Sequence, residues 1–282
     1  MENLWAFLFQ SIEASLTAAV LLVVKRLFLD KLSPRWQYGI WGVLAVRLLL
    51  PAGLGGRALL PPVRTALEMA KTAAESSLSS AFSHPFSLIR VYAPIPLFSP
   101  GLAPRSVTDW LFCLYAAGVA VCLLWYLFSY LRLRRAVSRG YAPEGDALER
   151  VATVCRKYDL PLPRRVRVCA WTSSAFVCGP LRPVLVLPRG EVDEKVILHE
   201  LLHLKHGDVW AGVGMCLLRC LHWCNPLIGY CCNRAQNDCE SLCDQRVLER
   251  LEGEERREYG RILLSMADDR YARAPGTSSM AN

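Results

Sequence analysis

The sequence predicts an α-helical membrane region with about three transmembrane helices, followed by an α+β domain. Hydrophobic residues make up 53% of the 282 residues, a high share for a soluble protein. The long uninterrupted apolar runs lie in the first half, whereas short β-branched runs and helical periodicity follow Gly140. We therefore divide the chain into a membrane region at 1–131 and a second domain at 132–282.

Three apolar runs are expected to form the membrane helices, near 4–24, 36–50 and 110–131. A helix needs about 20 apolar residues to cross a bilayer core of roughly 30 Å, and the first and third runs supply them. The first run differs from a signal peptide, because its basic residues, Lys25 and Arg26, follow the apolar residues instead of preceding them. All three runs are therefore assigned to the membrane region.

Charged residues predict how these helices are oriented. The 25–35 connection and the segment after residue 131 are densely basic, whereas 51–109 carries a few basic residues over a much longer stretch. The positive-inside rule then places the N-terminus and the 51–109 loop outside the cell, and everything after 131 in the cytoplasm. Within the helices, Glu13 is expected to face protein or a polar defect rather than lipid, and Arg47 to reach the interface.

The net charge and the cysteines argue against two other classes of protein. The charge of +8 comes from basic residues beside apolar runs, so the bilayer is an expected partner and nucleic acid is not. None of the twelve cysteines precedes Cys113, so none lies in the 51–109 loop that is placed outside the cell. Reduced thiols are therefore expected rather than a disulfide scaffold. Cys216, Cys220 and Cys224 repeat at helical spacing, which is more typical of core packing than of a thiolate metal site.

The second domain combines strand and helix patterns. Short β-branched runs predict strands at 165–169, 175–178 and 183–187. Helical periodicity predicts helices at about 147–158, 193–205 and 234–250. A charged stretch at 252–258 leads into a weakly periodic tail.

The helix at 193–205 carries the residues on which a chemical function depends. His199 and His203 are four residues apart, so both imidazoles project from one face and can reach one metal ion. Glu200 lies beside that face, where it can act as a general base. Apolar residues flank all three, so these polar groups are expected to be buried, which favours a functional site over a solvated groove.

A catalytic zinc ion needs three protein ligands and one open position, and the two histidines supply only two. The helix at 234–250 places Glu240 and Asp244 one turn apart on the same face. Glu240 is the predicted third ligand, and Asp244 is expected to accept the second ring N–H of a ligand histidine. The competing interpretation is a solvated acidic face.

The apolar stretch at 209–232 has two interpretations. It is long enough to span a membrane, but a single span would separate Glu240 from His199. A buried or membrane-surface helix that ends near Pro226 is therefore favoured.

Several ordered motifs carry a family resemblance. HELLHLKHGDVW, HWCNPLIGY and DCESLCDQRVL follow one another in the second domain, with SSAFVCGPLRPVLVLP before them and WQYGIWGVLAVRLLLP in the second membrane run. Together they resemble the Bla/Mec-type antirepressor zinc metallopeptidases of bacteria, the β-lactam sensor-transducers and their relatives. The resemblance implies a gluzincin-like zinc peptidase domain in the cytoplasm, attached to the cell membrane. It implies His199, His203 and Glu240 as Zn²⁺ ligands, Glu200 as the general base and Asp244 as a residue beside the ligands.

The resemblance also implies a role in signalling. Such proteins convert an extracellular stimulus into cleavage of a transcriptional repressor, so a repressor is the implied protein substrate. The sensor members continue into a fourth span and an extracellular penicillin-binding domain, whereas this sequence stops at Asn282. A short relative without a sensor, or a fragment, is expected, and β-lactam sensing is not.

Two alternatives to a regulatory endopeptidase stay open. One is a membrane protease of the CAAX-prenyl or heat-shock type, which shares the HExxH and downstream Glu-x-x-x-Asp patterns. The other is a non-catalytic regulatory membrane protein, although every expected catalytic position is occupied. His222, Tyr230 and Arg234 are candidate oxyanion stabilisers, and the sequence leaves both the substrate and an oligomeric state open.

Overall fold

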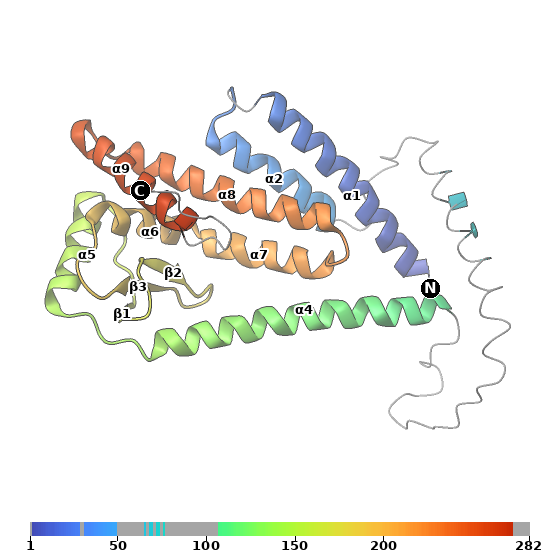
Figure 1. Cartoon of the computed structure of the whole chain (residues 1–282), viewed down its shortest axis with the longest axis horizontal. Helices are drawn as coiled ribbons and strands as arrows, with labels where there is room; N and C mark the ends of the chain where they lie inside the picture. The colour runs from blue at the N-terminus through green and yellow to red at the C-terminus, as the bar shows by residue number, and fades with distance from the viewer. Residues whose placement is uncertain are drawn as a thin grey trace. The chain divides into compact units, whose positions relative to one another are not determined.

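The computed structural model describes residues 2–28, 31–49 and 107–272, with single helical positions at 65, 68, 69, 72, 73 and 76. The described chain is mostly helical and contains a small sheet (Figure 1). Nearly all of the expected outer loop at 51–109, including most of its helical spacing at 57–75, lies outside the described residues.

The chain divides into two compact units. The first unit comprises Met1–Leu127 and Cys216–Arg234, and the second comprises Phe128–Met215 and Ala235–Asn282. The structure thus groups 216–234 with the membrane region, although the sequence alone left this segment in the second domain. The boundary at residue 131, between the membrane region and the second domain, stays a prediction.

Helices form at all three positions where membrane helices were predicted. They are α1 (Glu2–Leu27), α2 (Pro34–Leu49) and α4 (Val107–Ser138). Within the described residues, one stretch is long and apolar enough to cross a membrane, the 29 residues Trp110–Ser138 of α4. α2 has 16 residues, fewer than the roughly 20 that a full span needs. Crossing of the membrane at 4–24 and 36–50 therefore stays a prediction.

Two contacts join α1 to α2. The carboxylate of Glu13 forms an ion pair with the guanidinium group of Arg47, and both side chains are largely buried. The Nζ atom of Lys25 lies 5.2 Å from the centre of the Trp41 ring, within the range of a cation–π contact. Glu13 therefore faces protein, as predicted. Arg47 bonds to Glu13 instead of extending to an interface, because burial of either charge alone would be costly.

The apolar stretch at 209–232 is a helical hairpin rather than one helix. α7 (Asp208–Leu221) ends before the turn, and α8 (Pro226–Leu248) begins after it. Asn225 caps α8, because its Oδ1 accepts hydrogen bonds from the backbone N–H groups of the second and third residues of the helix, at 3.2 and 3.3 Å. Pro226 suits the first position of a helix, where no N–H is needed. The favoured interpretation, a helix ending near Pro226, was thus close, and the single span was wrong.

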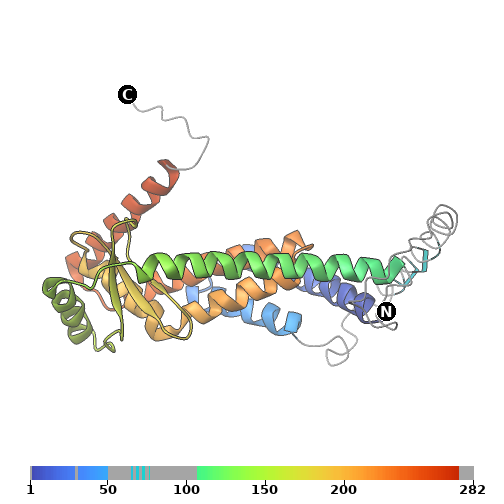
Figure 2. The same cartoon turned by 90° about the horizontal axis from the view of Figure 1, so that it is seen from below.

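The second unit is built around a three-stranded sheet. Its strands β1 (Val166–Cys169), β2 (Phe176–Cys178) and β3 (Val184–Pro188) lie in the order β1-β3-β2. β1 runs parallel to β3, and β2 runs antiparallel to it. The C-terminal end of α4 lies beside this sheet (Figures 1 and 2). All three strands agree with the prediction to within one residue.

Helices pack on the sheet and form the core that holds the candidate site. They are α5 (Gly145–Lys157), α6 (Glu194–His206), the C-terminal half of α8 and α9 (Gly253–Ala272). The core contains fully buried side chains from α5, β3, α6 and α8, among them Val151, Leu185, Leu198, Leu202 and Val247. A mostly helical fold with a membrane-competent helix is thus established, while the gluzincin-like class stays a prediction.

Two helix boundaries differ from the predicted ones. α8 begins at Pro226 rather than near residue 234. Asn225 and Pro226 start the helix before the segment whose polar residues repeat with helical spacing. The charged stretch at 252–258 is the first part of α9, which the sequence pattern had left as the start of a tail. The second difference matters for function, because α9 carries a residue that contacts the site.

Candidate metal centre

Two histidines on one face of α6 and one carboxylate on α8 point at a common position. The Nε2 atoms of His199 and His203 lie 3.0 Å apart. The Oε2 atom of Glu240 lies 3.5 Å from the first and 3.4 Å from the second. The structure thus brings together the three side chains that the sequence predicts as metal ligands.

The local sequence explains why α6 is placed there. Asp193 caps the helix by accepting a hydrogen bond from the N–H of Lys195 at 2.8 Å, and Gly207 ends it with a φ of 70°. Ile197, Leu198, Leu201 and Leu202 are buried in the core. The apolar face of α6 therefore packs against the core. The two imidazoles project from the helix beside this face.

A tyrosine and an aspartate hold the far side of the His199 ring. Its Nδ1 lies 2.9 Å from the hydroxyl oxygen of Tyr259 and 3.2 Å from Oδ1 of Asp244. The Tyr259 hydroxyl donates a hydrogen bond of 2.7 Å to the same Oδ1. Since that hydroxyl proton is used, its oxygen accepts from Nδ1–H, and the Nε2 lone pair of His199 is left to face the common position.

Asp208 holds the other ring in the same way. The Nδ1 atom of His203 lies 2.8 Å from Oδ2 of Asp208, whose side chain is 11% exposed. A carboxylate accepts hydrogen bonds and cannot donate them, so Nδ1 carries the proton. The guanidinium group of Arg246 lies 3.7 Å from the same carboxylate and pairs with it.

The resulting arrangement suits a cation. When both imidazoles are neutral, their two Nε2 lone pairs and one carboxylate oxygen converge at 3.0–3.5 Å, and all three are acceptors. Ligand atoms about 2.0–2.2 Å from a tetrahedral zinc ion are separated by roughly 3.3–3.5 Å. The donor set therefore fits zinc, as do both distances to Glu240, whereas the two Nε2 atoms lie about 0.3 Å closer together than this range. Carboxylate or phenol partners on both Nδ1 atoms are a common feature of protein metal sites.

The charges around the site favour a bound cation as well. Burial lowers the pKa of His199, but hydrogen bonds with Asp244, Cys243 and Glu240 outweigh it and raise that pKa to about 11. Burial likewise lowers the pKa of His203, and Asp208 is the main group that raises it above the usual value. Hydrogen bonds from both imidazoles lower the pKa of Glu240. A metal ligand must be a neutral imidazole, so uptake of a metal ion would release protons.

Glu200 lies next to this centre with a different environment. Burial raises the pKa of its carboxyl group to about 6, while the two neighbouring histidines oppose the change. The backbone of Val177 in β2 lies close enough to the carboxylate to act against this rise in pKa as well. A carboxyl group with a pKa near the working pH can accept and return a proton, which is what a general base needs.

Cys243 offers a second possible set of ligands. Its Sγ lies within 4.8 Å of ligand atoms of both His199 and His203. The Cys243 side chain is fully buried, and its thiol donates a hydrogen bond of 3.4 Å to the backbone oxygen of His199. The Glu240 side chain is 57% exposed, so the set with Glu240 opens toward solvent. Since a catalytic metal needs an open position, we favour Glu240.

The three candidate oxyanion stabilisers named from the sequence belong to the first unit. His222 is buried in the first unit, where its Nδ1 lies 3.2 Å from the hydroxyl of Ser11, so it serves a contact within that unit. Tyr230 and Arg234, the other candidate oxyanion stabilisers, belong to the first unit as well.

Sequence reasoning missed Asp208 and Tyr259. Asp208 stands five residues after His203 in the motif and begins α7, where the turn at Gly207 brings it back to the ring. A local signal for it was therefore present. Tyr259 comes from α9, which is far along the chain and has no fixed spacing to the histidines, so no sequence signal marks it.

Asp208→Ala is expected to weaken zinc binding by roughly 10–100-fold, the usual effect of removing a partner of a metal-bound histidine. The His203 ring would lose the acceptor that fixes its orientation and its tautomer. Competition with a chromophoric zinc chelator measures the affinity. Glu194→Gln, an exposed change on the same helix, is the matched control. Equal zinc affinity in Asp208→Ala and wild type would show that Asp208 does not position the ring.

Tyr259→Phe is expected to have a smaller effect on zinc affinity than Asp208→Ala. Asp244 lies 3.2 Å from Nδ1 of His199 and can accept its proton directly once the hydroxyl is gone. Asp244→Ala combined with Tyr259→Phe removes both partners and should match or exceed the loss in Asp208→Ala. The same chelator competition measures all three proteins. A double variant no weaker than Tyr259→Phe would contradict this account.

Comparison with known proteins adds a family match. A family model described as BlaR1 peptidase M56 matches residues 5–281. The regulatory protein BlaR1 of Bacillus licheniformis is 28% identical over 168 residues, which cover 57% of this chain and 28% of that protein. The methicillin resistance mecR1 protein of Staphylococcus aureus is 22% identical over 275 residues, covering 92% of this chain and 46% of that protein. The chain therefore spans less than half the length of these relatives.

Proposed function

The chain belongs to the BlaR1 peptidase M56 family, and on that premise we propose that it is a membrane-bound zinc-dependent endopeptidase. The observation that carries the proposal is the convergence of three acceptor atoms, two of them on imidazoles held from behind by Asp208, Tyr259 and Asp244. His199, His203 and Glu240 would hold the zinc ion, which would provide Lewis-acid catalysis of amide hydrolysis when bound.

The residues of the chain perform the remaining steps. Glu200 accepts a proton from the attacking water and returns it to the leaving amine, for which its raised pKa suits it. Asp208, Asp244 and Tyr259 keep the two imidazoles in one orientation and tautomer during the reaction.

The edge of the sheet supports a peptide as the substrate. β2 is at one end of the strand order, and among the described residues no strand pairs with its outer side. β2 contacts α6, and the backbone of Val177 in β2 lies close to the carboxylate of Glu200, so this edge strand runs beside the candidate general base. An exposed edge of this kind offers backbone groups to an extended peptide.

We further propose that the peptidase is regulatory. The relatives are named as a regulatory protein and a methicillin resistance protein, and family membership favours this role over a CAAX-prenyl or heat-shock protease. A signal received outside a bacterial cell would then lead to cleavage of a cytoplasmic transcriptional repressor. The multi-pass topology with an outer N-terminus belongs to the same proposal. The complete acceptor set disfavours a non-catalytic role.

Substrate trapping with purified components tests the proposed function. The Glu200→Gln protein should retain a protein substrate that the wild type releases as two fragments. The retained protein must then be cut by the purified wild-type chain at a defined peptide bond, and a zinc chelator must stop the reaction. A repressor among the cut proteins supports the regulatory role. Absence of chelator-sensitive cleavage by the full chain in lipid would overturn the peptidase assignment.

A further inference from the structure

Five arginines line one cavity of the second unit, which we call the arginine pocket. The cavity has a volume of about 440 Å³, and its cationic residues are Arg134, Arg164, Arg165, Arg167 and Arg182. Among the described residues that line it, none is acidic. Like charges gathered without a carboxylate create a strongly positive potential, which attracts an anion.

The arginines keep most of their donors unused within the described part of the chain. Arg134 donates to the hydroxyl of Tyr130 at 3.4 Å, and Arg167 donates to the backbone oxygen of Gly140 at 3.3 Å. None of the five forms an ion pair with a described residue. Each guanidinium group offers five N–H donors in a planar fork that matches the oxygens of a phosphate.

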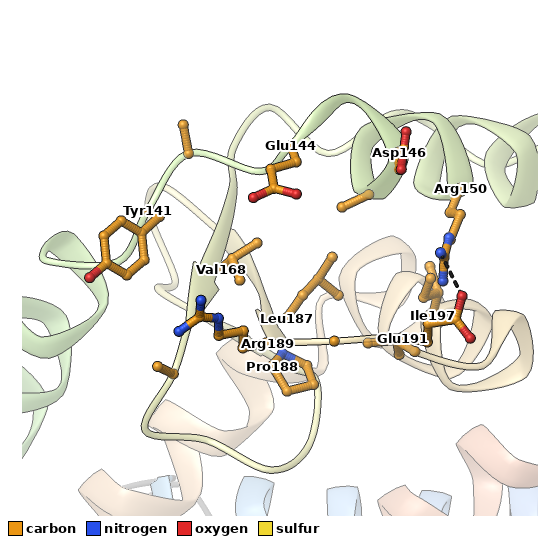
Figure 3. Close-up of a pocket in the computed structure, with 15 residues that line it drawn as sticks. Tyr141, Glu144, Asp146, Arg150, Val168, Leu187, Pro188, Arg189, Glu191 and Ile197 are labelled. Atoms are coloured by element: carbon orange, nitrogen blue, oxygen red, sulfur yellow. Dashed lines mark hydrogen bonds and ion pairs between the residues drawn. The ribbon is translucent and has the colours of Figure 1, made fainter.

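The pocket differs in this respect from a larger cavity on the same unit. That cavity, of about 940 Å³, is lined by Glu144, Asp146, Arg150, Arg189 and Glu191. Figure 3 shows Arg150 and Glu191 joined by an ion pair, at 2.9 Å. Its charges are mixed and partly neutralised, so it has no preference for one sign of ligand. It supplies a matched control surface.

The elements that carry the five arginines are firmly held. Val137 near the end of α4 is buried against Cys169 and Val186 of the sheet, with Leu133 beside it. The turn between β2 and β3 that carries Arg182 depends on Gly179, whose φ is 94°. A side chain at Gly179 would approach the backbone oxygen of Arg182 within 2.8 Å. The backbone of α4 and of the β2–β3 turn around the pocket is therefore held in place without a ligand.

The pocket lies where α4 changes from apolar to basic. The membrane-competent stretch of α4 is Trp110–Ser138, and its uncharged run ends at Leu131. Tyr130 and Leu133, on either side of that point, both line the pocket. Leu181, next to Arg182, is 80% exposed. Basic pockets beside the ends of membrane helices suit the head groups of anionic lipids.

We propose that the arginine pocket binds the phosphate of an anionic phospholipid in the leaflet where the apolar part of α4 ends. This inference rests on the proposed membrane attachment and is independent of peptidase activity. The bound head group would neutralise the clustered guanidinium groups and fix the depth at which the second unit meets the bilayer.

The double variant Arg164→Gln/Arg182→Gln tests the proposal by native mass spectrometry of the full chain in detergent. Wild type should retain added phosphatidylglycerol and not phosphatidylcholine. The double variant should bind phosphatidylglycerol roughly 25-fold more weakly, from about 1 kcal/mol for each basic residue near an anionic membrane. Both side chains are exposed, so folding should be unaffected, which a melting temperature checks. Arg164→Lys/Arg182→Lys, which keeps the charge, should restore part of the affinity.

Arg189→Gln removes one charge from the control cavity and should leave phosphatidylglycerol retention unchanged. Equal retention of phosphatidylglycerol by wild type and the double variant overturns the proposal, as does equal retention of both lipids by wild type. If inorganic phosphate stabilises wild type and phosphatidylglycerol does not compete with it, the ligand is a free phosphate and the lipid assignment is wrong. Alkaline extraction of membranes separately tests membrane attachment, so failure there is distinguishable from failure of the pocket.

Discussion

Glu200→Gln is expected to lower the rate of peptide cleavage by about 10²–10⁴-fold, the usual contribution of a general base, while zinc stays bound. The amide cannot accept the proton of the attacking water, and His199, His203 and Glu240 are untouched. The measurement pairs single-turnover cleavage of a protein substrate with the zinc content of the same preparation. Loss of activity with full zinc content assigns the proton transfer to Glu200.

His203→Ala is the companion variant, because it should lose zinc and activity together. If the purified Glu200→Gln protein is inactive because it has lost zinc, Glu200 has a structural role. Full activity in Glu200→Gln would remove the basis for the peptidase mechanism. Burial of Glu200 makes a folding check by melting temperature necessary for both proteins.

Local periodicity was enough to predict the part of the site on α6. His199 and His203 share a face because they are one turn apart, and any helix through this segment places them together. Glu240 and Asp244 were accessible for the same reason, since they are also one turn apart on a second helix. Their approach to the histidines depends on how α8 packs against α6. The need for a third ligand suggested this approach from the sequence, and the resemblance supported it.

The contacts that hold the imidazoles were harder to predict, because they depend on where helices begin. Asp208 follows a helix end at Gly207, and its approach to His203 results from the turn geometry there. Tyr259 lies on α9, whose charged first turns gave no apolar pattern. The break at Asn225 was visible in sequence, but its consequence, an α8 that returns as a hairpin partner of α7, is a tertiary feature.

The fold, like the site, was predicted where a pattern is local in the sequence and not where it depends on tertiary packing. Strands of β-branched residues between Gly and Pro were placed to within one residue, because their pattern is local. The order β1-β3-β2, with one parallel and one antiparallel pair, has no local pattern and was not predicted. That order places β2 at an edge next to Glu200, which is the feature that relates the fold to a peptide substrate.

Glu240→Ala is expected to weaken zinc binding by more than the roughly 10–100-fold caused by losing an outer partner, because it removes a direct ligand. Cys243→Ala should leave zinc affinity and cleavage close to wild type. The two side chains compete as the third ligand, since the Sγ of Cys243 also lies within 4.8 Å of ligand atoms of His199 and His203. Zinc affinity, cleavage rate and melting temperature should be compared in both variants.

Substitution of the protein-bound zinc by cobalt gives a second, direct measurement of this choice. A thiolate ligand adds an intense charge-transfer absorption that nitrogen and oxygen ligands lack. The spectrum of wild type should lack that absorption, and Cys243→Ala should leave it unchanged. Loss of metal in Cys243→Ala with retention in Glu240→Ala would establish a His-His-Cys centre. Because Cys243 is fully buried whereas Glu240 is 57% exposed, such a centre would be closed to substrate and structural rather than catalytic.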